Sequence, residues 1–435
     1  MASPYLTALE HQPIPIAEES SAWSLTPAEA TRLSQIGELR PGFCEIGYRK
    51  VKLAQYCGVV SVGDRVLEIL PKTQYGDAGA EECRGVLLRL LRASHRFPQF
   101  QYLPAGQHLH NAPLLEVFIA AYFNAIVIIG RGGLLRQYEQ RDEDLSVVRG
   151  RIDIARQLTV HANRPDRVAC SFDELTADNV WNRVLKQAMR VVRPWIRSVD
   201  LGRRWIELMN LFDEVGDSSL KRPQLMRLTF NRHAERYRIA IDWAKWILAT
   251  LSPAFRAGSN EAPTLLFDMN KLFESAVSAV LKVRAACEEG LTVVSQDRGM
   301  SLAIAASILR SEPAFWLRPD LVVYAGNTPI SIADAKWKAI EMDRAGRLVP
   351  SHHDLYQLHA YAAAFKCKDL ALIYPWHSRL GRSIETRYEL PGSEGVVTTV
   401  HILCVDVNDD ALNLTRGSKG GRVGNLFLGR AAIES

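Results

Sequence analysis

Two short segments in the last third of the chain carry the residues best suited to chemistry. They are Leu317-Arg318-Pro319-Asp320 and, after a short gap, Asp334-Ala335-Lys336. Two carboxylates and an ammonium brought together at this spacing can hold a divalent metal ion and activate water against a phosphodiester. Lys336 is the only lysine of the chain with an acidic residue two positions before it, so this pattern differs from the chain's other charged residues.

The residues between the two segments predict a β-hairpin that joins them. Two apolar runs flank the turn Gly326-Asn327-Thr328-Pro329. A hairpin centred on Asn327 places Asp320 opposite Asp334. Because side chains alternate between the two faces of a strand, Asp334 and Lys336 point the same way. We therefore expect all three charged groups to converge on one face.

An ordinary hairpin with solvated charges would give the same pattern. Two features argue against it. The residues before Asp334 are small or apolar, which is typical of a buried strand, and a buried carboxylate needs a partner or a metal. Trp337 follows directly, which is unusual at a merely solvated edge.

Two further residues are candidates for the same site. Apolar residues recur at helical spacing over residues 267–283, with Asp268 or Asn270 as the N-cap. Glu274 on this helix is either a third carboxylate for the site or an ordinary surface glutamate. Gln357 and Tyr361 are four residues apart and share a helix face, either beside the site or as an incidental polar stripe.

The order of elements predicts an α+β multidomain chain. Residues 259–435 alternate helix, strand, hairpin, helix and strands, which indicates a mixed sheet flanked by helices. Residues 1–150 suit an α+β domain with a capping box at Thr26-Pro27-Ala28-Glu29 and a hairpin turn at Gly63-Asp64. This part has no catalytic constellation, which fits docking of a partner. Residues 151–258 are mostly helical, and residues 253–263 have the composition of a linker.

A run of arginines lies near the junction of the first two parts. Acidic residues at 142–144 interrupt it. The run is either a solvated face, or a surface that contacts phosphates or inserts into a partner ring. Its members are Arg131, Arg136, Arg141, Arg149, Arg151 and Arg156.

Composition limits the classes of protein that fit. A chain of 435 residues with 47% hydrophobic residues has enough apolar surface for two or three packed domains. The net charge of +5 and the pI of about 8.8 are compatible with nucleic-acid binding but also with many other proteins. None of the seven cysteines forms a Cys-x-x-Cys pair, which argues against a zinc ribbon or a disulfide framework and favours the cytoplasm.

Two kinds of segment are missing from the sequence. There is no signal peptide, and the most apolar run, residues 117–129, is shorter than the about 20 residues that span a bilayer, so we expect a buried helix and no membrane. There is no G-x-x-x-x-G-K-[ST] motif, so we expect no nucleotide bound by this chain. Any work driven by nucleotide hydrolysis must then come from a partner.

Several motifs together resemble a known family. Residues 267–375 resemble the PD-(D/E)xK nuclease superfamily, and the whole chain resembles the McrC family, the nuclease subunit of McrBC-type 5-methylcytosine restriction systems. The motifs that carry the resemblance are Tyr56-Cys57-Gly58-Val59-Val60, Leu67-Glu68-Ile69-Leu70-Pro71-Lys72, Val148-Arg149-Gly150-Arg151-Ile152-Asp153, Phe172-Asp173-Glu174-Leu175-Thr176-Ala177-Asp178-Asn179, Phe267-Asp268-Met269-Asn270-Lys271-Leu272-Phe273-Glu274, Leu317-Arg318-Pro319-Asp320 and Asp334-Ala335-Lys336-Trp337-Lys338.

The resemblance implies an activity and a partner. It implies a restriction-endonuclease-like domain that cuts double-stranded DNA with Mg²⁺. It also implies a separate AAA+ GTPase of the McrB type, on which the N-terminal part docks and whose GTP hydrolysis it stimulates. The tyrosine that often follows Asp-Ala-Lys in the family is Trp337 here, which keeps the aromatic bulk.

Each candidate residue then has an expected role. Asp320 and Asp334 would bind the metal, with Glu274 and the backbone carbonyl of Ala335 as further ligands. Lys336 would orient the attacking water or neutralise charge, and Gln357 would position the lysine, water or phosphate. Two alternatives remain: a non-catalytic scaffold that activates the GTPase, and a PD-(D/E)xK nuclease from another defence or repair system.

Overall fold

A computed structural model of the chain describes most of its residues, and contacts divide these into two compact units. The first unit comprises Met1–Gln101, Gln107–Leu114 and Leu265–Ser435, and the second comprises Tyr102–Gly106 and Leu115–Thr264. The described residues are 4–19, 21–72, 79–94, 97–102, 111–217, 220, 222–252, 255, 265–306, 311–380, 386–391, 397–409, 412 and 414–415. The linker expected at residues 253–263 lies outside them, apart from Phe255.

The N-terminal part of the first unit contains a sheet with the strand order β1-β6-β5-β10. Strands β5 and β6 form the hairpin predicted around Gly63-Asp64, and β1 runs parallel to β6. Helix α1 begins with the predicted capping box, because Thr26 and Glu29 each accept a backbone hydrogen bond from the other. The elements are β1 (Tyr5–Leu9), β2 (Pro13–Pro15), α1 (Pro27–Leu39), β3 (Cys44–Gly47), β4 (Lys50–Leu53), β5 (Tyr56–Val62), β6 (Arg65–Leu70), α2 (Ala80–Ala93), η1 (Pro98–Tyr102) and β10 (Leu266–Asp268).

Gly58 allows the chain to return to this sheet after the second unit. Its φ is +133°, and a Cβ at this position would lie 1.9 Å from the carbonyl oxygen of Leu265. The adjacent N–H of Val59 donates to that same oxygen at 2.8 Å. Only glycine permits this approach, so Gly58 explains how β10 pairs with β5.

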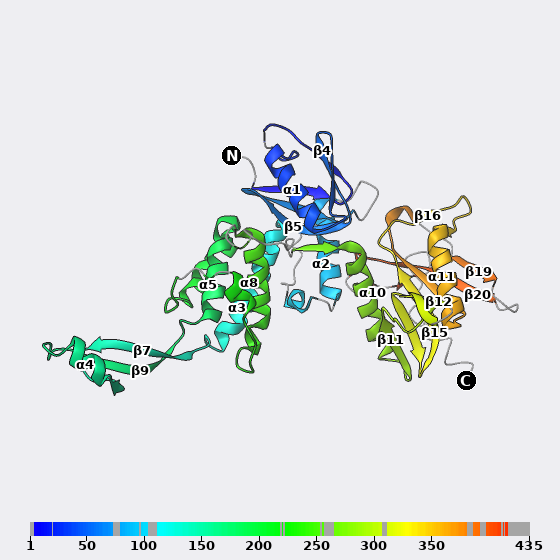
Figure 1. Cartoon of the computed structure of the whole chain (residues 1–435). Coiled ribbons are helices and arrows are strands. Elements are labelled where there is room, and N and C mark those ends of the chain that lie inside the picture. The colour runs from blue at the N-terminus through cyan, green and yellow to red at the C-terminus, as the bar shows by residue number, and fades with distance from the viewer. Residues whose placement is uncertain are drawn as a thin grey trace. The chain divides into compact units, whose positions relative to one another are not determined.

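The C-terminal part of the first unit is a mixed sheet with the order β11-β14-β15-β18-β20-β19, and β21 pairs with β20. Strands β14 and β15 are antiparallel, whereas β15, β18 and β20 run parallel, as a mixed sheet requires. Helix α10 packs against β11 and β15, and α11 packs against β15 and β18 (Figure 1). The elements are α10 (Met269–Ala285), β11 (Leu291–Ser295), β12 (Ser301–Ala306), β13 (Ser311–Trp316), β14 (Leu321–Ala325), β15 (Thr328–Ala335), β16 (Glu341–Met342), β17 (Leu348–Val349), α11 (His352–Phe365), β18 (Asp369–Pro375), η5 (Ser378–Leu380), β19 (Thr386–Pro391), β20 (Val397–Val405) and β21 (Leu414–Thr415).

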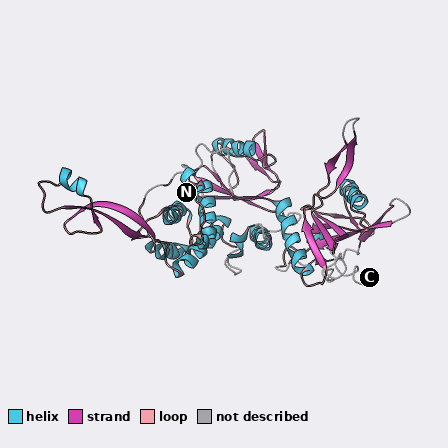
Figure 2. Ribbon diagram, turned by 60° about the horizontal axis from the view of Figure 1, so that its bottom comes forward, coloured by secondary structure: helices cyan, strands magenta, loops and turns pink. Residues whose placement is uncertain are grey.

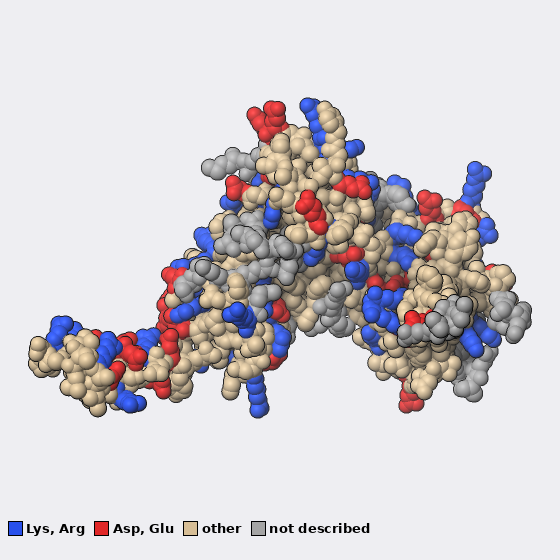
Figure 3. Space-filling view, viewed as in Figure 1, with Lys and Arg blue, Asp and Glu red and all other residues tan. Residues whose placement is uncertain are grey.

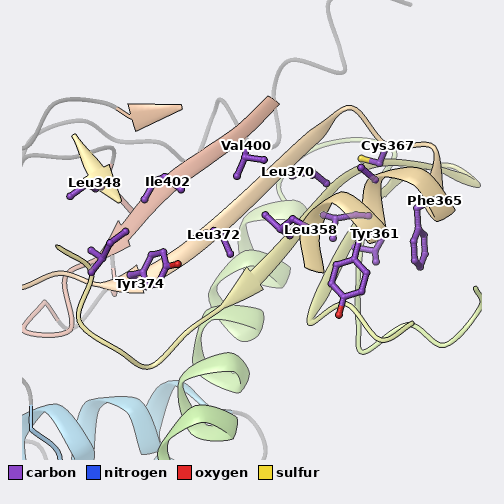
Figure 4. Close-up of a cluster of buried hydrophobic side chains, with 14 of the residues drawn as sticks. Leu348, Leu358, Tyr361, Phe365, Cys367, Leu370, Leu372, Tyr374, Val400 and Ile402 are labelled. Carbon is purple, nitrogen blue, oxygen red and sulfur yellow. The ribbon is translucent and has the colours of Figure 1, made fainter. Parts of the chain in front are cut away.

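A continuous apolar core lies between α11 and this sheet (Figure 4). Leu358 and Phe365 of α11 pack with Leu370 and Leu372 of β18, and all four are buried. The core holds α11 against the strands, so the polar side chains at one end of the helix have fixed positions relative to β15.

The second unit is mainly helical. Helix α3 is buried along most of its length: Tyr122 donates to the carbonyl of Leu185 in α5 at 2.7 Å, and Phe118 packs on Trp243 of α8. Its length and composition alone would also allow a membrane span. The helices are α3 (Leu114–Arg131), α5 (Val180–Val192), η3 (Arg193–Trp195), α6 (Val199–Asn210), α7 (Arg222–Met226), η4 (Glu235–Tyr237) and α8 (Arg238–Leu251).

An extended arm projects from the helices of the second unit (Figures 1 and 2). It consists of the long antiparallel pair β7 (Gln137–Leu145) and β9 (Val168–Thr176), the short strand β8 (Arg151–Ile152) and helix α4 (Ile154–Val160). Gly150 adopts a φ of +69° where a Cβ would lie 2.6 Å from the Ser171 carbonyl oxygen, so glycine is required for β8 to pair with β9.

The observed units differ from the expected boundaries. A boundary at residue 150 would cut the arm between β7 and β8, which belong to the same sheet. Helix α3, expected in the N-terminal domain, packs with α5 and α8 because its apolar surface needs other helices to cover it. Residues 266–268, expected in the C-terminal domain, form strand β10 at the edge of the N-terminal sheet.

Candidate active site

The β14–β15 hairpin brings the two motifs together in the predicted register. Leu321 pairs with Ala333, so Asp320 and Asp334 occupy the next position on each strand. The turn itself is tighter than predicted, because Ala325 pairs directly with Thr328 around Gly326 and Asn327. A bulge between Val323 and Tyr324 shifts the register by one residue and restores the expected alignment.

Three groups converge at the end of this hairpin. Asp320 Oδ2 accepts a hydrogen bond of 2.8 Å from the backbone N–H of Ala335. Lys336 Nζ lies 2.5 Å from Asp334 Oδ2, as expected for side chains on the same face. Asp334 is only 1% exposed. The solvated-hairpin alternative is therefore wrong for this residue.

Gln357 joins the site from the first half of α11. Ser351 caps this helix through the backbone N–H of Asp354. Gln357 accepts from Lys336 Nζ at 3.2 Å, and its amide nitrogen lies 3.3 Å from Asp334 Oδ1 and 2.8 Å from the Tyr361 hydroxyl. The polar stripe predicted on this helix thus faces the site and contacts both members of the ion pair.

Glu274 approaches from α10, whose N-cap is Asp268, one of the two residues that the sequence allowed. Its Oε1 accepts from Gln296 Nε2 at 2.5 Å, and Gln296 Oε1 accepts from Arg318 at 2.5 Å. Glu274 is close enough to Asp320 for its negative charge to raise the pKa of that carboxyl. The helix therefore brings a third carboxylate to the site.

The electrostatics of the site favour a bound cation. Burial, followed by the charges of Asp334 and Glu274, raises the pKa of Asp320 to about 8. Burial also raises the pKa of Asp334, although Lys336 opposes this shift. Burial lowers the pKa of Lys336, but the Asp334 charge outweighs it and the net pKa is raised, so Lys336 is an ammonium at neutral pH.

The donor set fits a divalent metal ion of the Mg²⁺ type. Asp334 Oδ2 is buried, and the Lys336 ammonium lies against it at 2.5 Å. Crowded carboxylate oxygens are what a hard divalent cation binds. Over the part of the chain that the structure describes, no three His, Cys, Asp or Glu side chains are already grouped around one metal position. A metal would therefore have to compete with Lys336 for Asp334.

Sequence reasoning missed two groups of residues beside the site. Gln296 and Arg318 link Glu274 to the segment that precedes Asp320. Arg318 belongs to the Leu317-Arg318-Pro319-Asp320 motif and could have been considered. Gln296 is an isolated glutamine after β11, and no sequence pattern indicates a role for it. Asp354, a buried carboxylate of α11, accepts from Lys338 at 2.6 Å and from Tyr374 at 3.0 Å.

The mixed sheet thus carries a buried and a half-buried carboxylate and a lysine at one end of a hairpin, and such oxygen donors suit a hard divalent cation. The chain belongs to the family described as McrBC 5-methylcytosine restriction system component, which it matches over residues 51–375. This match confirms the resemblance to McrBC-type restriction systems that the sequence motifs indicated.

Two relatives illustrate the range of similarity. The chain is 24% identical over 304 residues to the Type IV methyl-directed restriction enzyme EcoKMcrBC of Escherichia coli (strain K12), which covers 66% of this chain and 84% of that protein. The fold resembles a chain in a refined half-complex from a tetradecameric assembly of Thermococcus gammatolerans McrB AAA+ hexamers with bound McrC. The TM-score is 0.67 at 20% identity, and the alignment covers 93% of this chain and 95% of that one.

Proposed function

We propose that this chain is the Mg²⁺-dependent endodeoxyribonuclease subunit of a 5-methylcytosine restriction complex. The observation that carries the proposal is the convergence of Asp320, Asp334 and Lys336 at one end of the β14–β15 hairpin. Membership of the restriction-system family supports the substrate class, double-stranded DNA. The mixed sheet with α10 and α11 packed against it suits a PD-(D/E)xK arrangement.

The roles of the residues follow from their positions. Asp320 and Asp334 would hold Mg²⁺, with Glu274 and the carbonyl of Ala335 as additional donors. The metal, when bound, supplies Lewis-acid activation of water and of the phosphodiester. Lys336, released from Asp334, donates to the attacking water or to a phosphate oxygen. Gln357 holds the Lys336 ammonium in place from the opposite side.

The partner in this proposal is an AAA+ GTPase ring of the McrB type. The relative of known structure is described as McrB AAA+ hexamers with bound McrC. In this chain the β7–β9 arm carries exposed apolar side chains at its far end, among them Ile154, Leu158 and Val160 of α4. Such a surface fits a protein partner better than a phosphate backbone.

The arginines of the arm support the same assignment. Arg141 and Arg149 pair with Glu174, and Arg156 pairs with Asp144. Acidic and basic side chains alternate along the arm in Figure 3. Three of the six arginines of the run are thus paired within the arm, which favours a protein partner over DNA on this surface. We assign the arm to the GTPase ring.

The test is reconstitution of the full chain with the AAA+ GTPase from the same source. Cleavage of 5-methylcytosine-containing DNA is measured with GTP and Mg²⁺, alongside unmethylated DNA and the variant Asp334→Asn. We expect cleavage of the methylated substrate by the wild type only. Stimulation of GTP hydrolysis is measured in the same mixtures. Stimulation without cleavage by the wild type would favour the non-catalytic activator instead.

A further inference from the structure

The residue directly after the Asp334-Ala335-Lys336 motif joins three parts of the first unit. Trp337 follows β15 on the chain, and its ring packs on Phe273 of α10 at a centroid distance of 5.4 Å. Phe273 directly precedes Glu274 on that helix. Trp337 therefore touches the helix that supplies one candidate carboxylate and continues the strand that supplies another.

The indole of Trp337 is held by a glutamate from the other end of the chain. Its Nε1–H donates to Glu10 Oε1 at 2.9 Å, and the backbone N–H of Lys72 donates to the same oxygen at 2.9 Å. Glu10 follows β1, and its own N–H donates to the carbonyl of Leu70 at the end of β6. Through Glu10 the N-terminal sheet thus contacts the residue that directly follows the Asp334-Ala335-Lys336 motif.

The burial of Glu10 at this position is energetically unfavourable. Glu10 is 2% exposed, its Oε2 is buried and accepts no N–H or O–H hydrogen bond, and burial raises the pKa of its carboxyl. The charge of Lys72 and the Cys57 thiol of β5, a weak donor, oppose this rise in the pKa only in part. A buried carboxyl with few partners destabilises a fold, so the residue is not explained by the packing of the sheet.

A second connection joins the same two parts. Strand β10 is the edge of the N-terminal sheet, and its last residue, Asp268, is the N-cap of α10. Helix α10 is thus fixed to the sheet at its start by the chain itself. Trp337 and Glu10 add a second fixed point, where the backbone leaves β15.

We propose that Glu10 is a positioning residue of the nuclease site, acting through Trp337 on the relative placement of Glu274, Asp334 and Lys336. This inference rests on the proposed nuclease function. Glu10 touches neither the metal ligands nor Lys336, so it is not a catalytic residue. Its role is to keep the indole packed on Phe273, which fixes the position of α10, and so of Glu274, relative to the end of β15.

The test compares full-length variants with the GTPase partner on methylated DNA. Glu10→Leu keeps the volume but removes the acceptor, and we expect kcat to fall about tenfold or more with KM for DNA unchanged, since small displacements in an active site have large effects. Glu10→Gln keeps an oxygen for both N–H groups, and we expect its rate to stay within about threefold of the wild type. Trp337→Phe keeps an aromatic ring against Phe273 but loses the indole N–H, and should match Glu10→Leu.

A second readout does not depend on cleavage. Mn²⁺ is titrated against the chain alone, and the rise in melting temperature gives an apparent affinity. We expect Glu10→Leu to weaken the Mn²⁺ response about tenfold and Glu10→Gln to leave it intact. The double variant Glu10→Leu/Trp337→Phe should be no worse than either single one, because both remove the same contact.

The matched control is Glu68→Gln. Glu68 is another buried glutamate of the same sheet, but it pairs with Arg84 and does not touch Trp337. We expect it to lower the melting temperature without changing the rate per folded molecule or the Mn²⁺ response. Glu10→Leu with wild-type rate and wild-type Mn²⁺ response overturns the inference, as does an equal effect of Glu68→Gln. If the wild type is as inactive as Asp334→Asn, the nuclease proposal itself fails, and the inference fails with it.

Discussion

Asp320 and Asp334 lie opposite one another at the open end of the β14–β15 hairpin, and both carboxyls have a raised pKa. Burial is the larger cause for Asp320, and the charge of Asp334 adds to it. Asp334 is buried and Asp320 is half-buried, so negative charge on both carboxyls is unfavourable in the metal-free protein. A bound divalent cation removes this penalty, so the relationship ties stability, pH and metal binding together.

The first prediction concerns the stability of the metal-free protein. The pKa of Asp320 is about 8 in the folded state against a usual 3.8, so the folded chain holds a proton that the unfolded chain releases. Stability therefore falls as the pH rises from about 4 to about 8, by at most about 1.4 kcal/mol per pH unit. Asp320→Asn keeps an oxygen for the Ala335 N–H and should remove this dependence. Urea unfolding in EDTA at several pH values measures the free energy of unfolding of the wild type and of Asp320→Asn. The same pH dependence in both proteins would contradict the raised pKa of Asp320.

Metal binding should depend on pH in the opposite direction. Because Mg²⁺ competes with the proton on Asp320, its affinity should rise as the pH approaches 8. We expect Mg²⁺ to raise the melting temperature of the wild type more at pH 8 than at pH 6. Asp320→Asn should show little response at either pH. An equal response of the wild type at both pH values would mean that Asp320 does not ligate the metal.

The third prediction concerns Asp334. Asp334→Asn should abolish cleavage, because a neutral amide is a poor ligand for Mg²⁺. The fold should persist, since burial already disfavours the charge of Asp334 and the amide oxygen can still accept from Gln357. Circular dichroism and a melting curve establish folding, and a plasmid assay measures cleavage. Full cleavage by the folded variant would refute the nuclease site.

The fourth prediction concerns Lys336. Its ammonium fits between Asp334 Oδ2 at 2.5 Å and Gln357 Oε1 at 3.2 Å, in a setting where the side chain is only 25% exposed. Arginine keeps the charge but presents a wide planar fork. We expect Lys336→Arg to lose activity as fully as Lys336→Ala, on the order of 10²–10³-fold. The rate of single-turnover cleavage is measured for Lys336→Arg and Lys336→Ala. Near-normal activity with arginine would indicate that Lys336 acts only as a distant counter-charge.

The fifth prediction separates docking from cleavage. Gln137 and Thr176 are paired at the base of the arm, so a short Gly-Ser linker can replace residues 138–175. We expect this variant to lose stimulation of the GTPase while retaining the Mn²⁺ response of the chain alone. Asp334→Asn should retain stimulation of the GTPase and lose the Mn²⁺ response. Normal GTPase stimulation without the arm would move the docking surface elsewhere on the chain.

Part of the site could be predicted from the sequence because its determinants are local. Strand alternation and a Gly-Asn turn were enough to align Asp320 with Asp334, and the small apolar residues before Asp334 indicated its burial. Asp268 caps α10 through its immediate neighbours, as its position before an apolar helical pattern predicted. In each case the interaction joins residues a few positions apart, or residues linked by one hairpin.

The tertiary structure decided the contacts between distant segments. Nothing in the local pattern shows that β10 completes the N-terminal sheet, or that α3 packs with α5 and α8. The approach of Glu274 to Asp320, and of Glu10 to Trp337, depends on how helices and sheets pack across the whole first unit. Periodicity fixes which face of an element is apolar, but the partner of that face is chosen by shape and by polar groups that must be satisfied together.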